Sequence, residues 1–268
     1  MTLDVQVREQ LLSLLTRDAN NRADLHSALR LLSKWRSVLI QNTLLQQQGT
    51  VVMQGPLAGL DFLSQSAEGC HIAKLLGCYE QPLQPHIQAA IAKGYPTILN
   101  IGCAEGYYAV GLAMKMPNAR VLAHDLNPKA QETCTALALK NQVSDRVTVG
   151  GLFSPENFAT HAGQDVLVMC DIEGAERELL DPVASPALRS LDIIAESHEC
   201  LIPGVTELLM ERFKVTHHIT LVQDDGQRRL DNPPQWFVNL AHLDQLLATW
   251  EWRGGPTPWL VMRAKTPL

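Results

Sequence analysis

Short apolar runs alternate with amphipathic stretches along the part of the chain that follows Gly94. The runs at 97–101 (TILNI) and 165–171 (DVLVMCD) are continuous enough to suit parallel strands that are buried on both faces. Between such runs, stretches such as 128–141 and 205–213 place apolar residues at helical spacing. This alternation predicts an α/β fold with a doubly wound, mostly parallel sheet. The expected strands are 97–101, 120–125, 146–149, 165–171, 191–197, 215–222 and 258–264, and the last two are expected to form an antiparallel hairpin at the sheet edge.

The preceding residues are predicted to be helical. Apolar residues recur at helical spacing over 24–48, which fits one stripe along a single long helix. The stripe consists of Leu25, Leu29, Leu32, Trp35, Leu39 and Leu44. Packing against its own domain is the favoured role of this helix, and a lid or a dimer contact is the alternative. A second helix is expected to end at Gly94, because glycine suits a helix C-terminus. We therefore expect a helical region at 1–95, serving as lid or dimerisation element, and a sheet domain at 96–268.

Composition narrows the possible partners and the compartment. The 268 residues are 46% hydrophobic and carry a net charge of −6, which excludes wholesale disorder and disfavours binding to nucleic acid. We expect no membrane contact, because no apolar run is long enough to span a bilayer. The N-terminus does not resemble a signal peptide, and the six cysteines form no CxxC pair, so they are expected to be small buried hydrophobes in a cytoplasmic protein.

A glycine-rich turn follows the first strand. Gly102 and Gly106 stand between that strand and a helix, where glycine permits a sharp turn and close approach to a ligand. The next strand ends in Asp125, which is suited to hold both hydroxyls of a ribose. Ala104 replaces the second glycine of a dinucleotide fingerprint, and Glu105 would place negative charge where a pyrophosphate lies. The pattern thus favours an adenosyl ligand such as S-adenosylmethionine over NAD or FAD, with a generic turn and a solvated aspartate as the alternative.

The fourth predicted strand ends in an acidic loop. The sequence CDIEGAERELL brings Asp171, Glu173 and Glu176 to the carboxyl edge of the sheet, where open α/β folds bind ligands. Asp171 is a candidate to hold the cofactor or to act as a base, whereas Glu173 or Glu176 could simply cap the following helix. A divalent cation is possible here but is not predicted.

The fifth strand brings a histidine to the same edge. Its end, ESHEC, contains His198 beside carboxylates, which makes His198 a candidate general base near neutral pH. His217 and His218 lie within the sixth predicted strand and are expected to be structural.

Taken together, the chain resembles FkbM-type S-adenosylmethionine-dependent methyltransferases over about residues 74–215. The segments that carry the resemblance are LLGCYEQPLQPHI, NIGCAEGYYAVGLA, CDIEGAERELLDP and IIAESHE. The resemblance implies a class I methyltransferase fold with strand order 3-2-1-4-5-7-6 and an antiparallel seventh strand. It further implies methyl transfer, most often to a hydroxyl oxygen of a sugar or secondary metabolite.

The resemblance also implies roles for individual residues. The glycine loop would face the methionine half of the cofactor, Asp125 the ribose, and Gly151 with Leu152 the adenine. Glu80 is the weakest of these assignments. The implied cofactor-binding residues are Glu80, Gly102, Cys103, Ala104, Glu105, Gly106, Asp125, Leu126, Gly151, Leu152 and Asp171. We expect His198 to act as the base, with Asp171 or Glu173 orienting it or the substrate.

Three alternatives stay open at this point. The chain could methylate a small amine, could bind the adenosyl ligand without catalysis, or could be an NAD-dependent oxidoreductase, which Ala104 and Glu105 disfavour. The expected partner is a small-molecule acceptor, with a homodimer through the N-terminal helices as a further possibility. Specificity for the acceptor is expected to lie in the N-terminal helices and in the insertion 223–257.

Overall fold

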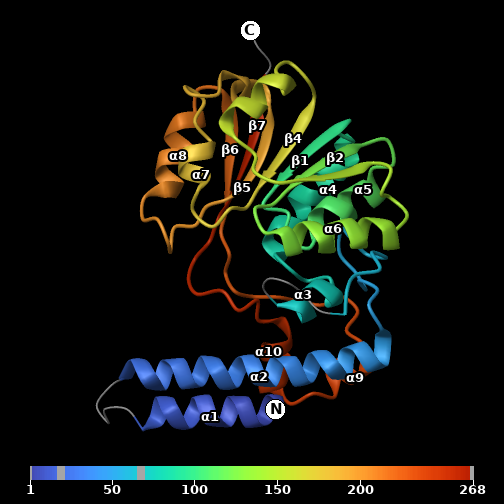
Figure 1. Cartoon of the computed structure of the whole chain (residues 1–268), viewed down its shortest axis with the longest axis vertical. Helices are drawn as coiled ribbons and strands as arrows, with labels where there is room; N and C mark the ends of the chain where they lie inside the picture. The colour runs from blue at the N-terminus through green and yellow to red at the C-terminus, as the bar shows by residue number, and fades with distance from the viewer. Residues whose placement is uncertain (1, 17–21, 65–69, 266–268) are drawn as a thin grey trace.

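The computed structural model describes residues 2–16, 22–64 and 70–265 and is organised around one sheet (Figure 1). The seven strands follow the order β3-β2-β1-β4-β5-β7-β6. Strands β1 to β5 run parallel, and β7 runs antiparallel to both β5 and β6. This order and this direction of β7 confirm the expected Rossmann-like class I methyltransferase fold. The strands are β1 (Thr97–Ile101), β2 (Arg120–His124), β3 (Val147–Gly150), β4 (Val166–Cys170), β5 (Asp192–Glu196), β6 (His217–Val222) and β7 (Trp259–Ala264).

Burial on both faces explains why the strands appear as continuous apolar runs. Successive side chains of a strand point to opposite faces. In β4, Leu167 and Met169 join the core on one face, while Val166 and Val168 join the core on the other. The first core contains α4 (Gln84–Lys93), α5 (Tyr107–Lys115) and α6 (Pro128–Lys140), and the second contains α7 (Glu176–Leu179) and α8 (Val205–Phe213). Short 3-10 helices lie at Gln81–Leu83, Pro155–His161 and Pro186–Ser190.

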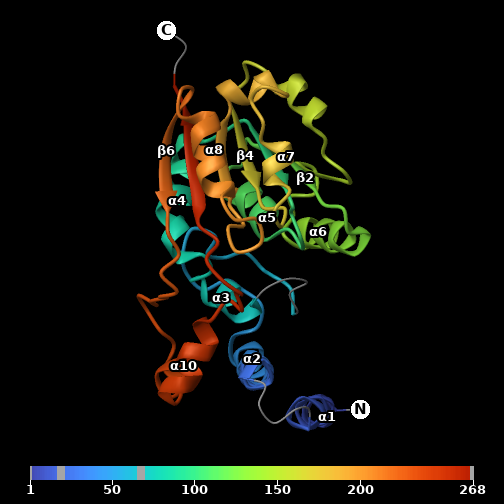
Figure 2. The ribbon, with the colours of Figure 1, turned by 90° about the vertical axis from the view of Figure 1, so that its left-hand side faces the viewer.

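The remaining helices lie beyond the carboxyl edge of the parallel strands. They are α1 (Leu3–Leu15), α2 (Arg22–Gln48), α3 (His71–Leu76), α9 (Gln235–Val238) and α10 (His242–Thr249). In both ribbon views α3 lies between the sheet and α2 (Figures 1 and 2). Helix α1 packs along α2, and α10 packs on α2 and α3. The predicted long helix is therefore present, and part of the insertion 223–257 folds onto it.

The leucine stripe of α2 is packed over only part of its length. Leu44 is buried, whereas Leu25 and Leu29 are 62% and 65% exposed. Helix α1 packs along α2, and Trp35 of the stripe donates its Nε1–H to Asp4 of α1 at 2.8 Å. Packing on the domain thus accounts for Leu44, while the exposed Leu25 and Leu29 leave a lid or a dimer contact open as the alternative.

The structure also tests the expectations for the cysteines and for His217 and His218. Five of the six cysteines are buried, but Cys200, in the loop after β5, is exposed. His217 is buried and its Nε2 lies 2.8 Å from the carbonyl oxygen of Leu191, as a structural histidine would, while His218 is exposed. Among the described residues, no helix is both long enough and apolar enough to cross a membrane.

Candidate functional site

Two cavities meet at the carboxyl edge of the parallel strands. The first, which we name the outer cavity, has a volume of about 350 Å³ and lies beside the ends of β1, β2 and β3. The second, named the inner cavity, has a volume of about 360 Å³ and lies between the ends of β1, β4 and β5 and the segment 251–259. Gly102, Asp171 and Glu173 line both cavities. The two cavities are therefore neighbouring parts of one candidate site.

The structure distributes the predicted residues between these cavities. The outer cavity is lined by Gly102, Asp125, Leu126, Gly151, Leu152 and Asp171. The inner cavity is lined by Gly102, Cys103, Ala104, Glu105, Asp171, Glu173 and His198. Glu80 and Gly106 line neither cavity.

The two glycines of the loop are required by contacts within the protein. Gly102 has φ +78°, and a Cβ there would lie 1.6 Å from the carbonyl oxygen of Asp171. Gly106 has φ +93°, and its Cβ would lie 2.7 Å from the Sγ of Cys134 on α6. Close approach to the residue after β4 and to α6 therefore requires glycine at these positions, apart from the close approach to a ligand that the sequence suggests. Because of this packing, the loop and Asp171 form one continuous wall.

The side chain of Asp125 holds the same loop by hydrogen bonds. Its Oδ2 accepts the backbone N–H of Ala104 at 2.9 Å, and its Oδ1 accepts that of Asn127 at 2.8 Å. Each carboxylate oxygen keeps a second lone pair, so the group can still accept hydrogen bonds from a ligand in the outer cavity. The sequence pointed to Asp125 for ligand binding and missed this structural role.

Glu105 differs from its expected environment. Its side chain is fully buried, and its Oε1 lies 2.5 Å from the Nζ of Lys74 on α3. A carboxylate without a cation beside it would disfavour a pyrophosphate, as expected from the sequence. Glu105 is instead paired with Lys74, so its charge is offset within the protein and that expectation is wrong.

His198 is oriented by a carboxylate that the sequence analysis took mainly for a helix cap. The Oε1 of Glu176 lies 3.0 Å from Nδ1 of His198. Glu176 is fully buried and also accepts the backbone N–H groups of Ile172 and Gly174 at 2.7 and 2.9 Å. With Nδ1–H donated to Glu176, Nε2 of a neutral His198 is the acceptor nitrogen. The residue that orients His198 is thus Glu176 rather than Asp171 or Glu173.

Carboxylates surround the free nitrogen of His198. Nε2 lies 3.5 Å from Asp171, 3.4 Å from Glu173 and 4.0 Å from Glu196, measured to the nearest oxygen. Burial alone would lower the pKa of His198, but the bond to Glu176 and the charges of Glu196 and Glu173 outweigh it and raise the pKa. Burial, followed by the charge of Glu196, holds the pKa of Asp171 well above its usual range.

The same groups form a candidate cation site. Asp171, Glu196 and His198 offer ligand atoms that all lie within 4.8 Å of one another. Arg253 pairs with Glu196, and either a proton or a divalent cation would balance the remaining negative charge of the group. Metal removal distinguishes the two, because only an enzyme that uses a metal ion loses activity in a chelator.

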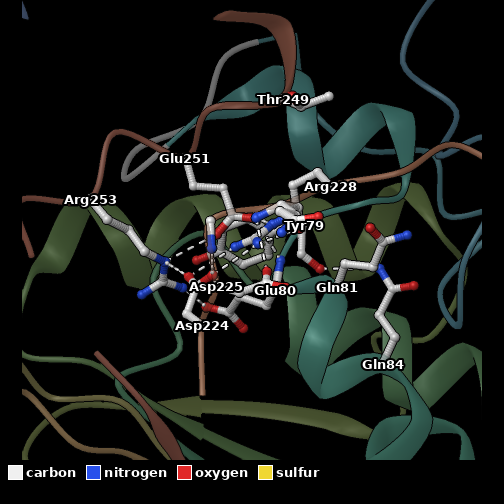
Figure 3. A network of polar contacts seen from close by, with 12 residues as sticks. Tyr79, Glu80, Gln81, Gln84, Asp224, Asp225, Arg228, Thr249, Glu251 and Arg253 are labelled. Carbon is white, nitrogen blue, oxygen red and sulfur yellow. Dashed lines mark hydrogen bonds and ion pairs between the residues drawn. The ribbon is translucent and has the colours of Figure 1, made fainter. Parts of the chain in front are cut away.

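A buried network links the site to the insertion (Figure 3). Arg253 forms ion pairs with Glu80 at 2.8 Å and with Asp224 and Glu251 at 3.1 Å, and it also pairs with Glu196. Burial raises the pKa of Glu80 to about 7, although the charge of Arg253 opposes the change. The network joins the segment before β1 to the segment after β6.

Glu80 is part of this network and does not line the outer or the inner cavity. Its Oε2 accepts the hydroxyl of Tyr108 at 2.5 Å, while Arg253 binds Oε1. These contacts serve the protein itself, so they lend no support to the assignment of Glu80 to the cofactor. Sequence reasoning missed Tyr108 and Arg253, because no motif marks a pair of residues so far apart along the chain.

Left-handed backbone conformations gather at the site. In the described chain, five non-glycine residues have positive φ, and four of them lie in or next to the cavities: Glu80, Ala104, Glu173 and Trp252. Each such conformation costs on the order of 1 kcal/mol or more, and such residues cluster where ligands bind. The backbone therefore supports the same location as the side chains.

Comparison with known proteins gives distant similarities in fold. No protein-family model matches the chain, and no curated protein matches it. Cofactor-bound Rv0187 from MTB is 18% identical over 66% of this chain and 77% of its own, with a TM-score of 0.45. An O-methyltransferase from Bacillus cereus in complex with SAH is 14% identical over 66% and 77% of the two chains, with a TM-score of 0.47. The O-methyltransferase TomG from Streptomyces achromogenes, in complex with SAM, is 14% identical over 69% and 80%, with a TM-score of 0.47. The fold assignment rests on strand order and direction rather than on these similarities.

Proposed function

We propose that the protein is an S-adenosylmethionine-dependent methyltransferase of FkbM type, acting on a hydroxyl oxygen of a small molecule such as a sugar or secondary metabolite. One observation carries the proposal. The cavity that contains Asp125 and the cavity that contains the His198–Glu176 pair share the wall formed by Gly102 and Asp171. An adenosyl group bound in the outer cavity and the base in the inner cavity would therefore lie close to each other, on either side of this wall.

The residues present fit the cofactor. Asp125, at the end of β2, keeps acceptor capacity for a ribose, and Leu126, Gly151 and Leu152 line the same cavity for an adenine. Gly102, Ala104 and Asp171 would hold the methionine half. The acidic groups Asp171, Glu173 and Glu196 line that end, and a ligand with a sulfonium and an ammonium group would favour their charged forms. When bound, S-adenosylmethionine supplies an electrophilic methyl group.

His198 would remove the proton of the acceptor. Its Nε2 would take the hydroxyl proton while the acceptor oxygen forms its bond to the methyl carbon and the carbon–sulfur bond breaks. Glu176 holds the imidazole in the required tautomer and stabilises the imidazolium that results. Asp171 and Glu173, which flank Nε2, would orient the acceptor hydroxyl.

Two variants test this function, because one should change turnover and the other should change the affinity for the cofactor. His198→Ala should lower turnover by about 10²- to 10⁴-fold, the usual contribution of general base catalysis, while S-adenosylhomocysteine affinity measured by calorimetry stays within about twofold. Asp125→Ala should weaken S-adenosylhomocysteine binding at least about tenfold, because a charged hydrogen-bond acceptor is lost. Asp145→Ala, at an exposed acidic residue after α6, is the control and should change neither quantity.

The alternatives give different results in the same experiment. A loss of cofactor affinity in His198→Ala would contradict the assignment of the base, and full turnover in that variant would favour methylation of an amine. Tight binding without any S-adenosylhomocysteine formed across an acceptor panel would favour a non-catalytic module. Stabilisation by NAD but not by S-adenosylhomocysteine in a thermal-shift assay would favour an oxidoreductase.

A further inference from the structure

The inner cavity has a basic part as well as an acidic part. Three cationic side chains line it: Lys34, Lys74 and Arg253. Lys74 is paired with Glu105, and Arg253 is paired with several carboxylates. Within the described ranges, Lys34 forms no ion pair with a carboxylate; its Nζ lies 5.0 Å from the centre of the Trp252 ring. In the part of the chain that the structure describes, Lys34 is thus a partly buried cation that lies over an aromatic ring without a carboxylate partner.

Several specific contacts hold the segment that surrounds Lys34 in place. Arg30, one turn earlier on α2, donates to the backbone carbonyls of Trp252 and Arg253 and stacks over Trp250 at 5.4 Å. These contacts fix the segment 250–253 against α2. Trp252 itself has φ +63°, a conformation held only where the surroundings require it.

Unused hydrogen-bond donors line the cavity near the same segment. Buried indole Nε1 atoms of Trp252 and Trp259 have no hydrogen-bond acceptor among the described residues, and both side chains line the inner cavity. Trp259 is only 4% exposed, so its N–H cannot be satisfied by bulk water. Buried donors without acceptors cost free energy unless a ligand or ordered water accepts from them.

The cavity therefore offers acidic groups and hydrogen-bond donors to different groups of one ligand. Carboxylates and His198 lie at the strand ends, where a hydroxyl can donate its proton. Lys34 and Trp252 offer donors from α2 and from the segment after α10, and α2 lies beyond α3 from the sheet (Figures 1 and 2). Trp259, at the start of β7, lies opposite Glu196 in the sheet and so belongs with the strand ends. We propose that Lys34 and Trp252 form a subsite for an anionic group, a carboxylate or a phosphate, on the hydroxylated acceptor. This deepens the proposed function and rests on it.

The test measures anion binding apart from methyl transfer. The protein is saturated with S-adenosylhomocysteine and then titrated with benzoate or with inorganic phosphate, while calorimetry and thermal shift report binding. The wild type should bind at least one of the two anions, and the stronger of them identifies the acceptor group. Lys34→Met should lose at least about tenfold in affinity, Trp252→Phe should lose several-fold, and Lys34→Arg should retain binding.

Controls separate the possible failures. Lys214→Met, at an exposed lysine after α8, should leave anion binding unchanged. The proposal is overturned if neither anion binds the wild type, or if Lys34→Met binds as well as the wild type. A third outcome would also overturn the proposal: Lys34→Met loses affinity for S-adenosylhomocysteine, and the saturated wild type binds no anion. In that case Lys34 binds the carboxylate of the cofactor rather than a group of the acceptor. If the wild type does not bind S-adenosylhomocysteine at all, the proposed function fails, and titration of the unliganded protein still tests the subsite.

Discussion

At the scale of single residues, Glu176 and His198 form the best defined pair in the molecule. Three donors converge on the buried Glu176 carboxylate, and one of them is the imidazole of His198. The negative charge of Glu176 is one reason why the pKa of His198 lies above its ordinary value of 6.5. A base must be unprotonated to act, so turnover should rise with pH through this raised pKa.

Replacing Glu176 by glutamine should therefore move the acid limb of the pH–turnover profile. Glu176→Gln keeps the shape of the side chain but removes its charge, so the pKa of His198 falls and the acid limb shifts to lower pH. Turnover at the plateau should fall about tenfold or more, because the imidazolium formed in the reaction loses its partner. The profile is measured at saturating cofactor, with Glu178→Gln, an exposed neighbour on α7, as the control. A lower unfolding temperature with an unmoved acid limb would mean that Glu176 is only structural.

Sequence position located some of these residues but not their partners. His198 and Asp171 follow buried strands, and the carboxyl ends of parallel strands share one edge, so their proximity could be predicted. The choice between Glu173 and Glu176 could not, because it depends on the left-handed turn at Glu173 and Gly174 that directs Glu176 inward. The positive charge beside Glu105 could not be predicted either. It comes from Lys74 on α3, and no local sequence pattern indicates that α3 packs next to Glu105.

At the scale of elements, the insertion after β6 is fixed to the core by charge. Arg253 follows α10 and reaches carboxylates from the segment before β1, from β5 and from the loop after β6 (Figure 3). The central strands β1, β4 and β5 could be predicted because they are buried along nearly their whole length and are mostly apolar. The attachment of the insertion could not, because it depends on polar pairs that leave no periodic pattern.

Removing the cation of this network should destabilise the fold. Arg253→Met leaves buried carboxylates, including Glu80 and Glu196, without a partner, and breaking a buried pair in this way costs about 3–5 kcal/mol. The loss, measured by urea unfolding, should be smaller at pH 5 than at pH 8. With a pKa of about 7, Glu80 is mostly protonated at pH 5 and needs no cation. Arg229→Met, at an exposed arginine of the same segment, serves as the control and should cost little. A loss that does not depend on pH would contradict this account.

At the scale of the whole molecule, the N-terminal helices present an apolar surface. Leu12 and Leu15 of α1 and Leu25 and Leu29 of α2 are all more than half exposed. Both helices lie away from the sheet, so these leucines have no neighbour in the described chain that covers them (Figure 2). Contiguous exposed apolar residues often mark an interface between proteins.

We propose that a second copy of the chain covers these leucines. Sedimentation velocity should show a dimer whose population rises with concentration, because association depends on mass action. The double substitution Leu25→Glu and Leu29→Glu should shift the population to monomer and leave the unfolding temperature nearly unchanged. Leu139→Glu, at an equally exposed leucine on α6, should not affect association. A wild type that stays monomeric over the whole concentration range would contradict the proposal.

The contact between Gly102 and Asp171 has a further consequence for how two ligands would share the protein. The carbonyl of Asp171 fills the space of a Cβ at residue 102, so the two loops are in close backbone contact. Asp171 also lines both cavities. If a ligand in one cavity changes the protonation of Asp171, the occupancies of the two cavities are thermodynamically linked, and each ligand alters the affinity of the other by the same factor. Cooperativity of this kind would arise within one subunit, because the same residues line both cavities.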